Sequence, residues 1–101
     1  MGNLKINTDE IIKLGKQMKE ECYNFKNSIK SVKSDIDTLL ISWKGDDASA
    51  YSREITVIIA RMNKLEQDLE GMANFFINNA EYYKMAQRYA QEQTTKMVSS
   101  N

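Results

Sequence analysis

The sequence predicts an all-α protein, an antiparallel helix-turn-helix hairpin, and three observations support this fold class. Apolar residues recur at alternating steps of three and four along two long stretches, which is the spacing of a heptad seam on a helix. Proline, which breaks helices, is absent from the 101 residues. One short break separates the two stretches, so the second helix must fold back along the first. We therefore expect a single helical-hairpin domain over residues 1–101.

The first helix is expected over about residues 8–43. Thr8 is a candidate N-cap, and Asp9 and Glu10 follow it where negative charge suits the helix dipole. Gly15 lies within the apolar seam, which indicates either a close approach of two helices or a hinge. The seam consists of Met18, Cys22, Phe25, Ile29, Val32, Ile36, Leu39 and Trp43.

The turn is expected over residues 43–47. Gly45 suits a left-handed helix C-cap, because glycine has no β-carbon to clash there. Asp46 or Asp47 is then a candidate N-cap for the second helix.

The second helix is expected over about residues 47–92, running through Gly71, with a flexible polar tail over 93–101. Further apolar residues, among them Ile59, Phe75 and Tyr89, lie beside its seam. The seam consists of Tyr51, Ile55, Ile58, Met62, Leu65, Leu69, Met72 and Phe76, and continues at Tyr83, Ala86 and Ala90.

Two helices alone leave apolar side chains wet beside their seams. Covering one such side chain is worth about 1.5–3 kcal/mol, a large share of the stability of a small domain. We therefore expect the hairpin to dimerise into a four-helix bundle; a monomeric hairpin with an adhesive surface is the alternative. The expected interface residues are Ile12, Leu40, Ile59, Met62 and Phe75.

No combination of residues predicts an enzyme, a cofactor or a metal site. Histidine is absent and cysteine occurs once, which removes the commonest general base and most transition-metal ligand sets. Cys22 lies on the seam, where a buried inert thiol is favoured over a nucleophile. The net charge is zero, so nothing favours nucleic acid as a partner, and no small-molecule substrate is indicated.

Aromatic residues are the candidates for recognition. Trp43, the single tryptophan, can close the end of the helix pair or present its ring as an anchor at the tip. Tyr82, Tyr83 and Tyr89 come late in the second helix and could form a surface that another protein reads.

These features together resemble the WXG family of small ESAT-like proteins. The resemblance rests on Trp43-Lys44-Gly45 at the midpoint of the chain, heptads on both arms, and an N-terminus without the apolar run of a Sec signal. It implies a folded homodimer or heterodimer exported by a type VII secretion system, secreted or held at the cell surface. It also implies that Trp43 and Gly45 take part in recognition by the secretion ATPase.

The sequence departs from the family pattern at its export signal, which is Tyr-x-x-x-Asp/Glu. Gln93 stands four residues after Tyr89, and Glu92 only three. Either Tyr89 belongs to a degenerate signal, or a partner supplies the signal. The partner would be a related hairpin or the N-terminal helical region of a larger secreted toxin. The rival interpretation is a cytoplasmic coiled-coil adaptor that binds the helical region of a larger protein and is not itself secreted.

Overall fold

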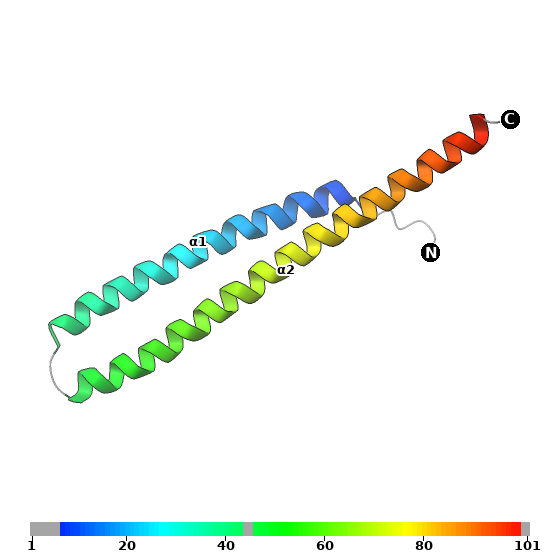
Figure 1. The fold of residues 1–101 in the computed structure, drawn as a ribbon. Coiled ribbons are helices and arrows are strands. Elements are labelled where there is room, and N and C mark those ends of the chain that lie inside the picture. Colours follow the sequence, from blue (N-terminus) through cyan, green and yellow to red (C-terminus); the bar gives the residue numbers. More distant parts are fainter. Residues whose placement is uncertain (1–6, 44–45, 100–101) are drawn as a thin grey trace.

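The computed structural model describes residues 7–43 and 46–99, and within these ranges it contains two long helices. Helix α1 spans Thr8–Ile41 and helix α2 spans Asp46–Ser99. Figure 1 shows them lying side by side, joined at one end, with α2 continuing beyond the start of α1. The predicted antiparallel helix-turn-helix hairpin is therefore confirmed.

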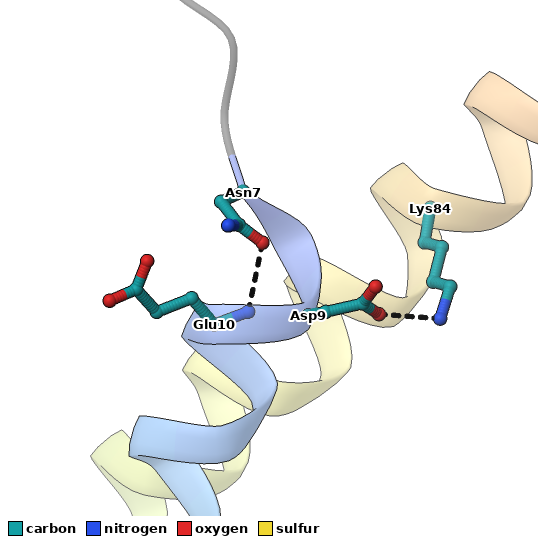
Figure 2. Close-up of polar contacts among 4 residues, drawn as sticks. All are labelled: Asn7, Asp9, Glu10 and Lys84. Carbon is teal, nitrogen blue, oxygen red and sulfur yellow. Dashed lines mark hydrogen bonds and ion pairs between the residues drawn. The ribbon is translucent and has the colours of Figure 1, made fainter.

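The N-cap of helix α1 lies one residue earlier than the sequence suggested. The side chain of Asn7, and not of Thr8, is the N-cap: its Oδ1 accepts a hydrogen bond from the Glu10 backbone N–H at 3.1 Å (Figure 2). Asparagine caps as well as threonine or better. Thr8 is instead buried against α2, because it falls on the row of α1 that faces that helix.

Helix α1 ends at Ile41 with Ser42 as its C-cap, two residues before the expected end. The backbone N–H of Trp43 donates to the carbonyl oxygen of Leu40 at 3.2 Å, which closes the last turn. Helix α2 then begins at Asp46. The predicted left-handed cap at Gly45 lies outside the described residues.

The two helices contact each other along rows of residues spaced seven apart. On α1 the buried residues are Thr8, Gly15, Cys22 and Ile29. On α2 the matching buried residues, here named the inner row, are Ile59, Glu66, Ala73 and Ala80. Two of the four are alanines, so the helix axes can approach closely. A β-carbon on Gly15 would lie 2.5 Å from Cγ1 of Ile77, which confirms a close approach there.

The predicted seam of α2 is wrong on one of its two edges. Ile55, Met62 and Leu69 are half-buried beside the inner row, as a seam requires. A second set of predicted seam residues is 49–52% exposed. The reason is that α1 covers the inner row, each residue of which follows an exposed one by a single position. This second set, here named the outer row, consists of Tyr51, Ile58, Leu65 and Met72.

Helix α2 also continues past residue 92, where a flexible tail was expected, and ends at Ser99. No proline or glycine follows Gly71 to interrupt it, and the helix runs through Gly71 itself as expected. The hydroxyl groups of Thr94 and Thr95 donate to the carbonyl oxygens of Ala90 and Gln91, each at 3.0 Å. These threonines thus place their polar groups along the helix, and the predicted flexible tail is corrected for residues 93–99.

Candidate interaction surface

One side of the hairpin presents large apolar side chains from both helices. Helix α2 contributes the outer row, and α1 contributes a parallel row in which Val32 and Leu39 are exposed and Met18 and Phe25 are half-buried. We name the two rows together the open face. Beside the α1 row lies a hollow of about 280 Å³, lined by Met18, Glu21, Cys22 and Phe25 of α1 and by Leu69 of α2. A second helical element could insert side chains there, as neighbouring helices of a bundle do.

The tip of the hairpin carries Trp43, just beyond the end of α1. Its ring stacks on Tyr51, with the ring centroids 4.9 Å apart and an angle of 29° between the planes. The residue nevertheless remains 43% exposed. Part of the indole is thus packed at the end of the helix pair and part is exposed to solvent. A role of the exposed part in recognition stays a prediction. Gly45, which was predicted to take part in recognition together with Trp43, lies outside the described residues.

At the opposite end of the hairpin, α2 is the only described element and forms a helical arm. Asp9, in the first turn of α1, accepts from Nζ of Lys84 at 2.6 Å, so α1 begins opposite Lys84 (Figure 2). Residues 85–99 run on from this point for about 22 Å at 1.5 Å per residue (Figure 1). Tyr89 lies on this arm and is 65% exposed. Trp43 and Tyr89, both predicted recognition residues, therefore lie at opposite ends of the molecule.

The five predicted interface residues lie in different environments. Phe75 is 62% exposed and stacks edge-on against Phe76, with ring centroids 6.0 Å apart. Ile12, Leu40 and Met62 are half-buried. Ile59 is the exception: the sequence suggested a partly wet side chain, but it is buried in the inner row against α1. That expectation is wrong because α1 covers the stripe containing Ile59 and leaves the stripe containing Ile58 exposed.

A buried carboxylate lies in the middle of the hairpin, and the sequence analysis missed it. Glu66 is 2% exposed in the inner row, and Nζ of Lys26 on α1 lies 3.8 Å from its Oε1. The same ammonium group lies 3.9 Å from Oε2 of Glu70. Heptad spacing could have indicated its burial, because Glu66 lies seven residues from both Ile59 and Ala73.

Cys22 is buried beside this charged group, as predicted from its place on the seam. Burial raises the pKa of its thiol above the ordinary value of 9.0, and the negative charges of Glu66, Glu70 and Glu21 raise it further. The thiolate is the nucleophilic form of cysteine. The surroundings of Cys22 therefore favour the inert protonated form and suit a packing role.

Among the described residues, no group of three or more Cys, Asp or Glu side chains is arranged to hold a metal ion. Neither α1 nor α2, over its described length, combines the length and apolarity needed to cross a bilayer.

The two long helices, with an aromatic residue at the tip and an exposed apolar face, define a class of small helical-hairpin proteins. The family model described as "Proteins of 100 residues with WXG" matches residues 3–94, and the chain therefore belongs to this WXG100 family. The family is associated with type VII secretion and consists of small helical proteins that generally lack enzymatic activity. No curated protein and no solved structure matches the chain.

Proposed function

We propose that this protein is a non-enzymatic component of a type VII secretion system that works as one half of a four-helix bundle. The open face carries the proposal. Its outer row exposes about half of four large side chains, and neither of the two described helices covers this exposed half. A second hairpin laid on this face would bury them. That hairpin is a second copy of this chain, a related protein, or the N-terminal helical region of a larger toxin.

Membership of the WXG100 family supports export of the protein from the cell. In this proposal the protein is made in the cytoplasm and leaves through the type VII system. The secretion ATPase reads Trp43 and Gly45 at the tip, with Tyr89 as a weaker contribution. The exposed part of the Trp43 ring is what a receptor would contact.

Association is tested by placing a charge on the open face. Leu65→Glu puts a carboxylate at the centre of the outer row, where a partner would have to bury it. Gln67→Glu is the matched control, because it adds the same charge on α2 at an exposed position away from both rows. In sedimentation of the purified chain, alone and with products of neighbouring genes, Leu65→Glu should abolish the complex and Gln67→Glu should preserve it. Equal association of both variants would show that the open face is not the interface.

Export is tested at the tip. Trp43→Ala should stop secretion while the protein stays helical and associated, and Ile41→Ala is the control because Ile41 is also large and exposed near the turn. Trp43→Phe keeps an aromatic ring for the stack on Tyr51, so it separates loss of the indole from loss of packing. Normal secretion of Trp43→Ala would exclude the recognition role.

The second candidate is the cytoplasmic adaptor, and one observation favours it. No acidic residue stands four positions after Tyr82, Tyr83 or Tyr89, so the sequence lacks a complete Tyr-x-x-x-Asp/Glu signal. The adaptor would use the same open face to bind a helical region of a larger protein. Detection of the protein in lysate alone, from cells whose secretion system is active, would favour the adaptor.

A further inference from the structure

The two rows of α2 differ in charge as well as in exposure. The outer row is wholly uncharged, whereas the inner row contains Glu66. This carboxylate is buried more completely than Ile59 in the same row, and α1 provides the neighbouring cation from Lys26. Lys26 itself is less enclosed, with 44% of its side chain exposed.

An ion pair with one buried member adds little net stability. Apolar side chains of similar volume are often as good, because the buried carboxylate of Glu66 loses its hydration. Removing one member is different, since the remaining charge is then buried without compensation. The pair therefore affects mainly which helix packs on the inner row. A helix that brings no cation to the level of Glu66 would leave this carboxylate buried and unpaired.

We propose that the Lys26–Glu66 ion pair reserves the inner row of α2 for α1, and so directs any partner helix to the outer row. A foreign apolar helix that displaced α1 would leave Glu66 buried and unpaired, but the same helix could cover Tyr51, Ile58 and Leu65 without burying a charge. The inference rests on the proposed function only in taking the open face as the surface that a partner covers.

Cys22 provides the readout, because it is buried between the helices one turn from Lys26. Its alkylation by iodoacetamide in the full chain, divided by the rate for the same variant in denaturant, measures how often α1 leaves α2. Lys26→Met should raise this ratio by about tenfold or more, because it leaves Glu66 unpaired. Lys26→Met with Glu66→Leu should return it to the wild-type value. A ratio unchanged in Lys26→Met, or still raised in the double variant, would overturn the proposal.

The choice of row is tested with a synthetic helical peptide that has a leucine seam without charges. Added to the wild-type chain, the peptide should leave Cys22 protected; added to Glu66→Leu, it should speed alkylation by displacing α1. Equal effects on both proteins would overturn the proposal. Leu65→Glu separates this from the proposed function: peptide binding that survives this variant argues against the open face, while the alkylation ratios of the Lys26 and Glu66 variants still decide on the ion pair.

Discussion

The close approach of the helices at Gly15 gives the sharpest test of the packing, because Gly71 offers a matched control in the other helix. Replacing a helical glycine with alanine stabilises a helix by about 0.8–1 kcal/mol when nothing obstructs the new methyl group. At Gly71 no atom lies within 4 Å of the position of the new β-carbon. Gly71→Ala should therefore gain close to the full amount.

Gly15→Ala meets an obstacle that cancels this gain. Its β-carbon would lie 2.5 Å from Cγ1 and 3.2 Å from Cδ1 of Ile77, against a favourable carbon–carbon separation of about 3.5–4.0 Å. Ile77 is itself buried, so its side chain has little room to withdraw. Overpacking of this kind costs about 1–3 kcal/mol. Gly15→Ala should thus be about 1–3 kcal/mol less stable than Gly71→Ala.

Thermal unfolding followed by circular dichroism measures the difference, at one fixed protein concentration because association adds to apparent stability. For a chain of this size, 1 kcal/mol corresponds to about 4–8 °C in Tm. Effects of the added methyl group on the unfolded chain are alike at the two sites and cancel in the comparison. Equal stabilisation by both substitutions would refute the close approach. Ile77→Ala provides a second check: it costs stability alone but should make Gly15→Ala tolerable, so the two changes should not be additive.

Three further outcomes follow from the described contacts. Asn7→Ala should cost about 1 kcal/mol in chemical unfolding because it removes the N-cap of α1, whereas Asp9→Asn, which breaks an exposed ion pair with Lys84, should cost less than about 1 kcal/mol; the reverse order would contradict the capping assignment. The raised pKa of Cys22 means that the unfolded chain loses the thiol proton at lower pH than the folded chain, so the Cys22 contribution is complete below the unfolded pKa and is lost as pH rises through the folded pKa. Unfolding measured across this alkaline range should show a steeper loss of stability for the wild type than for Cys22→Ala, and parallel curves would contradict the shift. Hydrogen exchange over residues 93–99 should show helical protection because α2 extends to Ser99, and exchange at the rate of an unstructured chain would contradict that helix end.

The hairpin was predictable because its determinants are local. Steps of three and four, a single short break and the absence of proline are all visible in the sequence. The side of α2 that faces α1 was not predictable from the same information. Ile58 and Ile59 are neighbours, and a periodicity argument favours the row with the larger apolar residues, which is the outer row.

In the folded hairpin the inner row faces α1, although its residues are smaller on average than those of the outer row. Gly15 on one helix and Ala73 on the other allow the backbones to approach, and side chains as large as Leu65 or Met72 on the inner row would hold them apart. Glu66 made the inner row harder to predict, since an acidic residue in a sequence normally indicates a solvent-exposed position. Its burial depends on Lys26, forty residues earlier in the chain, and local patterns carry no such information.

The resulting separation of small and large residues bears on what kind of partner fits. Covering the exposed half of the four outer-row side chains is worth roughly 3–6 kcal/mol, taking half of about 1.5–3 kcal/mol for each. Association costs roughly 4–15 kcal/mol in lost freedom of motion, which exceeds this gain over most of its range, so a single apolar helix laid along the outer row binds only weakly. A hairpin also covers Val32 and Leu39 on α1 and contributes two apolar rows of its own, which at least doubles the favourable term. We therefore expect a partner that presents two helices to bind far more tightly than one that presents a single helix.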